Sequence, residues 1–179
     1  MKISSRRLLL ILVIIVVAIQ LYRPAETNPP EDPSHNIKAV AQVTPEVDQI
    51  FSRSCNDCHS HKTVWPWYSK IAPASWLVAS DVTDGRRHLN FSEFATYKTE
   101  RQQRRLSEIC DEVTEGGMPL KQYTWIHKET PLDRQQRDTV CAWTKAEQQR
   151  ITEKTGVQVP PPRKPGMQAE QKNSSAPKP

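Results

Sequence analysis

The sequence contains few residues from which a large hydrophobic core could be built. Only 36% of its 179 residues are hydrophobic, and an unbroken apolar run from Leu8 to Ile19 takes many of them. A domain of about 100 residues is only marginally stabilised by burial of its own side chains. We therefore expect one small domain with additional segments, whose folding a large apolar cofactor at its centre would assist.

The sequence also lacks the patterns of a β-sheet and of a nucleic-acid interface. No segment alternates apolar and polar residues as a half-buried strand does, so the domain is predicted to be all-α. The net charge is +5, but acidic residues are interleaved with the basic ones, and no long Lys/Arg tract with interspersed aromatic residues is present. We expect a solvated charged surface and no binding of nucleic acid.

The N-terminal apolar run has the features of an export signal. Lys2, Arg6 and Arg7 precede it, and Arg23 follows it. The run is short for a spanning helix, which needs about 20 apolar residues, but no small-residue cleavage site follows it. We predict that residues 1–22 form an uncleaved N-terminal transmembrane helix in the inner (cytoplasmic) membrane, with the rest of the chain in the periplasm. Cleavage after export is the open alternative.

Two proline-rich segments flank the predicted domain. Residues 23–43 indicate an extended linker that lifts the domain off the membrane. Residues 153–179 have almost no apolar content after the last predicted helix and are predicted to form a disordered Pro-rich tail. The folded domain is therefore expected over residues 44–152.

Four helices are predicted in this domain. The first begins at Thr44-Pro45, because threonine is a good N-cap and proline suits the first helical position. It is expected to end at a Cys-His motif. The second is predicted over residues 73–84, with Gly85 as its stop. Its inward-facing residues are predicted to be Trp76, Leu77 and Val82.

The third helix carries the clearest amphipathic pattern in the chain. It is predicted over residues 100–115 and ends at Gly116-Gly117. The fourth is predicted to begin at Thr130-Pro131 and to fade near Arg150. The residues that define the apolar face of the third helix are Leu106, Ile109, Cys110 and Val113.

The motif that carries chemistry is Cys55-Asn56-Asp57-Cys58-His59, which matches the C-x-x-C-H pattern of c-type haem attachment. Two intervening residues place both sulfurs on one edge of a porphyrin, where they form thioethers with its vinyl groups. The histidine that follows becomes the proximal iron ligand. We predict one covalently bound haem c per chain, held by Cys55, Cys58 and His59.

Two other sites are compatible with the cysteine pair. A redox dithiol of the thioredoxin type needs a βαβ context, which this sequence does not provide. A zinc site needs two further ligands, for which the candidates are His59, His61, His88 and His127.

Met118 is the predicted sixth iron ligand. It lies in Gly116-Gly117-Met118-Pro119, where the glycines allow a sharp bend and the proline keeps Met118 extended. A methionine opposite the proximal histidine gives the His/Met ligation that raises the haem potential. The alternatives are that Met118 fills a core gap, or that a histidine is the ligand. The candidate histidines are His61, His88 and His127.

Three further features have both a functional and a structural interpretation. The aromatic block Trp65-Pro66-Trp67-Tyr68 can shield a haem face or fill the core. Arg86, Arg87 and His88 can bind haem propionates, or the two arginines can be solvated. Cys110 and Cys141 can form a disulfide, which an oxidising compartment favours, or remain buried thiols.

With these motifs, the domain resembles the bacterial haem-binding domain family, a c-type cytochrome-like family of exported proteins. The resemblance covers about residues 45–145. It runs through Cys55 to Ser60, Trp65 to Pro73, Ser75 to Val78, Gly85 to Ser92, Glu115 to Leu120, Tyr123, His127 and Trp143. It implies a small cytochrome c-like helical domain around one haem, with His59 as one ligand and Met118 as its partner. Phe94 stands where the family often has tryptophan, and the family leads us to expect neither the proline-rich tail nor a particular partner.

The sequence favours electron transfer over enzymatic activity. Haem iron with His and Met ligands is coordinatively saturated, and therefore suits one-electron transfer to a membrane or periplasmic oxidoreductase. A haem-based gas or redox sensor would need an open or displaceable sixth position. A peroxidase-like enzyme would need a distal acid-base residue, for which His88 and His127 are candidates.

Overall fold

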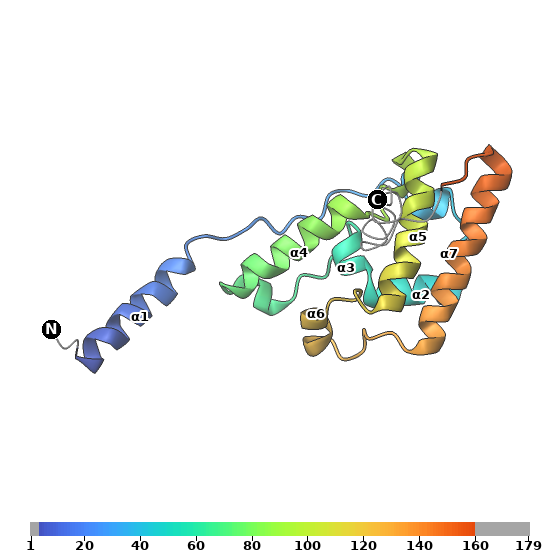
Figure 1. Cartoon of the computed structure of the whole chain (residues 1–179). Coiled ribbons are helices and arrows are strands. Elements are labelled where there is room, and N and C mark those ends of the chain that lie inside the picture. Colours follow the sequence, from blue (N-terminus) through green and yellow to red (C-terminus); the bar gives the residue numbers. More distant parts are fainter. Residues whose placement is uncertain (1–3, 160–179) are drawn as a thin grey trace, which may run out of the picture. The chain divides into compact units, whose positions relative to one another are not determined.

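Helices make up every regular element of residues 4–159, which are the residues that the computed structural model describes. Over this range there are seven α-helices, three short 3-10 helices and no strand, so the all-α prediction is confirmed (Figure 1). The chain divides into two compact units, one up to Thr96 and one from Tyr97 onward, which are described separately below.

The first unit contains most of the short elements. They are α1 (Ser5–Ile19), η1 (Ile37–Ala39), α2 (Pro45–Ser54), α3 (Asn56–His59), η2 (Trp67–Lys70), α4 (Ala74–His88) and η3 (Phe94–Thr96). The α3 helix contacts both α2 and α4, and η2 packs against α4.

The apolar N-terminal run forms α1, a helix of 15 residues. The predicted transmembrane helix is not supported, because no helix within the described part of the chain combines the length and the apolarity needed to cross a bilayer.

The start of α2 agrees with the prediction. The Thr44 side chain accepts a hydrogen bond from the backbone N of Val47 at 3.3 Å, and Pro45 occupies the first turn. The helix buries Val47, Ile50 and Phe51, and the Phe51 ring stacks on Phe91 with 4.6 Å between centroids. This apolar face fixes the end of α2 next to the Cys-His motif.

The α4 helix differs from the prediction in its end and in its buried face. It continues to His88, so Gly85 lies inside the helix and does not stop it. Of the three residues predicted to face inward, only Val82 is buried, whereas Leu77 is 51% exposed and Trp76 is partly exposed. The helix instead buries small residues beside Val82, namely Ser75 and Ala79, because it packs closely against its neighbours.

The proline-rich segment over residues 23–43 is not a free spacer along its length. Asn28 donates to the backbone O of Thr63 at 2.8 Å, and Glu31 accepts from Ser92 at 2.6 Å. Farther along, Ile37 is buried and its backbone N donates to Phe91 O at 2.8 Å. Side chains of this segment and the backbone N–H of Ile37 are thus bonded to the rest of the unit.

The second unit is built on two long helices, α5 (Thr99–Glu115) and α7 (Arg134–Thr155), which run side by side (Figure 1). The short helix α6 (Lys121–Ile126), which was not predicted, lies between them in the sequence. The α5 prediction holds: Leu106, Ile109 and Val113 are buried, and Gly116 ends the helix with a φ of 75°.

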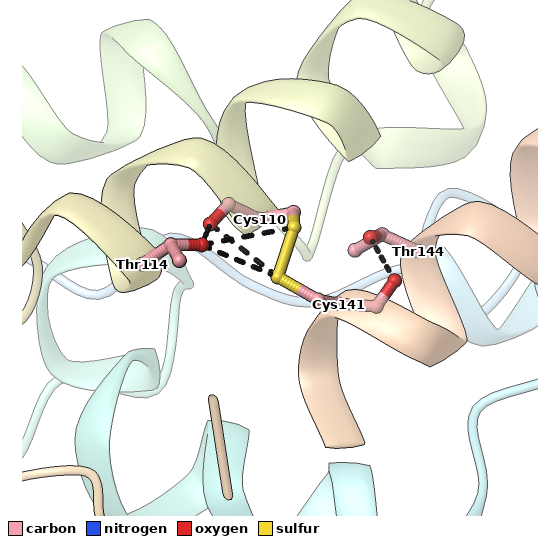
Figure 2. Close-up of a disulfide and its surroundings, with 4 residues drawn as sticks. All are labelled: Cys110, Thr114, Cys141 and Thr144. Carbon is pink, nitrogen blue, oxygen red and sulfur yellow. Dashed lines mark hydrogen bonds between the residues drawn. A yellow bond between two sulfur atoms is a disulfide. The ribbon is translucent and has the colours of Figure 1, made fainter. Parts of the chain in front are cut away.

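Cys110 and Cys141 form a disulfide that joins α5 to α7. Figure 2 shows the bond together with Thr114, whose hydroxyl donates to the backbone O of Cys110, and Thr144, which donates to Cys141 O at 3.0 Å. Of the two alternatives for this cysteine pair, the structure therefore has the disulfide.

The fourth predicted helix begins later and ends later than the sequence indicated. Asp133 is its N-cap, because its carboxylate accepts from Gln136 N at 2.8 Å while the Gln136 side chain accepts from Asp133 N. This reciprocal capping outweighs the Thr130-Pro131 signal. The helix continues to Thr155, so residues 153–155 are helical, and the rest of the predicted tail from residue 160 onward lies outside the described residues.

Candidate haem site

The Cys-His motif lies on α3, a single helical turn between α2 and α4. The backbone O of Cys55 accepts from the backbone N of Cys58 at 3.2 Å and of His59 at 2.9 Å. A helical turn places residues three apart on the same side of the helix, so the turn brings the two cysteines together. Both are free thiols and partly exposed.

The His59 ring is fixed by two backbone carbonyls. Its Nδ1 lies 3.1 Å from the O of Gly85 and 3.0 Å from the O of Leu89. A carbonyl oxygen only accepts hydrogen bonds, so Nδ1 must carry the proton. In the neutral ring the lone pair is then on Nε2, which is the atom available to a metal.

Burial lowers the pKa of His59, although the hydrogen bonds to Leu89 and Gly85 oppose this shift. Burial disfavours the charged form of an imidazole. His59 is therefore neutral at pH 7, as a metal-binding imidazole must be.

Gly85 permits the close approach of α4 to the motif. A Cβ on this residue would lie 2.5 Å from the O of Cys58 and 3.1 Å from its Cβ. Any larger side chain would therefore separate α4 from α3. Because Gly85 O also accepts from His59, the same residue controls both the spacing of the helices and the orientation of the His59 ring.

Both thiols are held in their protonated form. Burial raises the pKa of Cys55 to about 12, and Cys58 adds to the shift. Burial also raises the pKa of Cys58 to about 12, with further contributions from the carboxylates of Asp81 and Asp57. These are not the low-pKa, reactive cysteines of a redox dithiol.

Arg86 connects the loop after the motif to the N-terminal segment. Its guanidinium donates to Ser60 O at 2.8 Å and to Thr63 Oγ1 at 2.8 Å on the loop. It also donates to Thr27 O at 2.7 Å and to Asn28 Oδ1 at 2.9 Å. The guanidinium therefore has four protein partners, which does not support the predicted propionate role of Arg86.

The aromatic block after the motif takes part in the same contacts. The Trp65 indole donates to Asn28 Oδ1 at 3.2 Å, whereas the Trp67 side chain is 76% exposed. Trp67 therefore does not fill the core, and Trp65 helps to fix the segment that Arg86 holds.

The four residues predicted to bind haem are divided between the two units. Cys55, Cys58 and His59 lie together on α3 and the turn before it. Met118 belongs to the second unit, where its backbone N donates to Glu112 O at 3.1 Å and its side chain is partly buried. The prediction that Met118 is the sixth ligand remains a prediction.

The rival histidines have different surroundings. The Nε2 of His61 lies 2.9 Å from Asn90 Nδ2, and its buried Nδ1 has no hydrogen-bond partner. His88 is exposed at the end of α4. His127, in the second unit, stacks on Tyr123 with 4.4 Å between ring centroids.

Between residues 4 and 159, no group of three or more His, Cys, Asp or Glu side chains is arranged to hold a metal ion, so the zinc alternative gains no support.

Three groups that shape the site were not predicted from the sequence. They are the backbone carbonyls of Gly85 and Leu89, and Asn28 as the partner of Arg86. Every residue has a backbone carbonyl, so residue types do not show which carbonyls will orient a side chain. Asn28 lies in a segment that was predicted to be a linker. A glycine within a helical pattern was the one usable signal, because such a residue often marks close packing.

The donor set fits a haem. Two neighbouring thiols without a disulfide are available for thioether bonds, and a neutral imidazole with its lone pair on Nε2 is available to iron. Backbone hydrogen bonds that fix the ring are the usual support for a ligating histidine.

Comparison with known proteins agrees with this geometry. A family model described as haem-binding domain matches residues 14–146, a range that includes α3, α4 and Met118. No curated protein and no solved structure matches the chain. The matched range covers more than half of the sequence, and the chain therefore belongs to the haem-binding domain family.

Proposed function

We propose that this protein is a c-type cytochrome that transfers single electrons. Cys55 and Cys58 hold one haem through thioether bonds, and His59 is the proximal ligand. The observation that carries the proposal is the pair of hydrogen bonds from His59 Nδ1 to Gly85 O and Leu89 O, at 3.1 and 3.0 Å. With Nδ1 bonded to these carbonyls, the lone pair of Nε2 is left for iron.

The residues of the chain bind and orient the group, and a bound haem supplies a one-electron couple. Gly85 keeps α4 against Cys58, and Arg86 holds the loop from Ser60 to Thr63. Met118 is the proposed sixth ligand. His59 and Met118 together would saturate the iron of a bound haem, which favours electron transfer over an enzymatic role.

The proposed location is the periplasmic side of the inner membrane. The basic and apolar N-terminal segment is typical of an export signal. The Cys110–Cys141 disulfide supports an oxidising compartment. The redox partner is then an oxidoreductase of the membrane or the periplasm.

An optical spectrum of the haem-containing protein tests the proposal, with Met118→Ala and, as the matched control in the same loop, Leu120→Ala. We expect low-spin haem with a weak near-infrared band in the oxidised protein, which Met118→Ala loses and Leu120→Ala keeps. If the wild-type haem is high-spin, or if Met118→Ala has the same spectrum as wild type, Met118 is excluded as the ligand. Rapid binding of carbon monoxide would then favour a gas sensor, and peroxide turnover that depends on His88 or His127 would favour an enzyme.

A further inference from the structure

The α1 helix exposes apolar side chains on all of its sides. None of its residues is buried, and the large apolar residues from Leu8 to Val17 are each between 49% and 62% exposed. A protein partner covers one face of a helix, whereas lipid covers every face, so an apolar circumference indicates lipid. Arg6 and Arg7 near its start and Arg23 after its end suit anionic lipid headgroups.

The end of α1 is tied directly to the turn between η2 and α4. One residue after the helix, Gln20 donates from Nε2 to Ala72 O at 3.1 Å and accepts from Ala72 N at 2.9 Å. The Trp76 indole then donates to Tyr22 O at 3.0 Å, and the two rings meet edge to face at 6.1 Å. This turn therefore lies where the apolar helix ends.

Apolar side chains on this turn and on the two helices that it joins are about half exposed or more. Trp67 is 76% exposed, Ile71 48% and Leu77 51%. Tyr22 and Trp76 have rings with one apolar and one polar edge, which is the composition favoured at the boundary between lipid and water. The three exposed residues are thus beside a pair suited to that boundary.

The contacts continue from this turn to the haem site, so the distance between them is set by the fold. Lys70 pairs with Glu26, Asn28 bonds to Thr63 O, and Arg86 bonds to Thr27 O. A segment held at each of these positions cannot act as a free spacer.

We propose that Trp67, Ile71 and Leu77 form a lipid-facing turn, which enters the lipid interface beside α1 and seats the haem domain on the membrane surface. The inference rests on the membrane location given under the proposed function. It requires that α1 contacts lipid and not that α1 crosses the bilayer. It assigns a surface of the domain itself to lipid, in place of a tether that leaves the domain in solution.

The test uses the full-length, haem-containing protein in vesicles of phosphatidylethanolamine and phosphatidylglycerol. A fluorophore is attached at Ile71→Cys or, as the matched control, at Ser52→Cys on the exposed face of α2. For each label, fluorescence in vesicles with nitroxide-labelled lipid is divided by fluorescence in vesicles without it. Quenching by haem is the same in both and cancels in this ratio. We expect the label at residue 71 to lose most of its fluorescence to the lipid quencher, and the label at residue 52 to keep it. Adding Gln20→Ala, which removes both bonds to Ala72, should reduce the quenching at residue 71 while the protein still floats with the vesicles.

Two results would overturn the inference, and only the second would also contradict the membrane location. If the protein floats with the vesicles but residues 71 and 52 are equally unquenched, the turn does not contact lipid, and solvent or a protein covers it instead. If the protein does not float, both the lipid-facing turn and the membrane location are wrong. Neither result bears on the Met118→Ala spectrum, so a failure of the ligand assignment remains distinguishable.

Discussion

Gly85 on α4 and Cys58 on α3 are in such close contact that a Cβ on Gly85 would lie 2.5 Å from the carbonyl oxygen of Cys58. That contact is with backbone, which cannot move aside as a flexible side chain can. Gly85 O also accepts from His59 Nδ1. One backbone position thus sets both the place of Cys58 and the orientation of the His59 ring.

Gly85→Ala should therefore destabilise the protein and disturb the haem. Helix propensity by itself favours alanine over glycine by about 1 kcal/mol. Any fall in the free energy of unfolding would therefore come from the clash with Cys58. We expect the free energy of unfolding to fall by about 1–3 kcal/mol, as overpacking typically costs, with a lower haem content per chain. Urea unfolding and the pyridine haemochrome spectrum measure the two effects. Thr83→Ala, at an exposed position on the same helix, should change neither, and a stabilised Gly85→Ala would show that the contact is not tight.

The thiols should make the chain without haem less stable at high pH. Burial raises the pKa of Cys55 and of Cys58 to about 12 from an ordinary value of 9.0. The unfolded chain loses these protons first as pH rises, so the stabilisation is complete below about pH 9 and is lost between pH 9 and 12. Urea unfolding at pH 7 and pH 10 measures this loss. In the double variant Cys55→Ser/Cys58→Ser the loss should shrink, and an identical loss would mean that other groups cause it.

Removal of the disulfide should destabilise the second unit without altering the haem ligands. The bond joins positions 31 residues apart, and closure of a loop of that length stabilises the folded state by about 3–4 kcal/mol in the chain-entropy model. Cys110→Ala/Cys141→Ala should therefore lower the unfolding midpoint in urea. The optical spectrum of the haem is the control and should be unchanged. Equal midpoints for wild type and the double variant would contradict the prediction.

Arg86→Lys should weaken the connection between the motif loop and the N-terminal segment. A lysine ammonium cannot reproduce the fork by which Arg86 reaches Ser60 O, Thr63 Oγ1 and Asn28 Oδ1. We expect a loss of about 1–3 kcal/mol, the cost of leaving buried polar groups unpaired. The matched control is Arg87→Lys, because the side chain of Arg87 is 69% exposed and pairs with Asp84 within the same helix. Combining Arg86→Lys with Asn28→Ala should cost less than the sum of the single changes, since the two share a bond. If the two losses of stability are additive, Arg86 and Asn28 do not act through a shared bond.

Much of the helical pattern could be predicted from local sequence. Thr44 and Pro45 start α2, Leu106 and its neighbours define the face of α5, and Gly116 ends it. Each of these signals depends only on residues within one or two helical turns, so the local sequence is enough to predict it. The Cys-His spacing is local as well, so the motif formed by Cys55, Cys58 and His59 can be found in the sequence directly.

Other features depended on residues far apart in the chain. Gly85 was predicted to stop a helix that in fact passes through it, because the contact with Cys58 that explains this glycine comes from another element. For the same reason Leu77 and Trp76, apolar residues on α4, were wrongly placed in the core. Residues 23–43 have the composition of a spacer, yet their polar groups bond to Thr63, Arg86 and Ser92.

The sequence by itself determined the all-helical class, the Cys-x-x-Cys-His motif and the type of cofactor that such a motif binds, because short-range spacing encodes all three. Only the tertiary structure decided that two backbone carbonyls orient His59, that Cys110 pairs with Cys141, and that Asn28 meets Arg86. These are pairings between distant segments. Carbonyl groups are the same in every residue, and a side chain's partners are fixed only when the whole chain has packed.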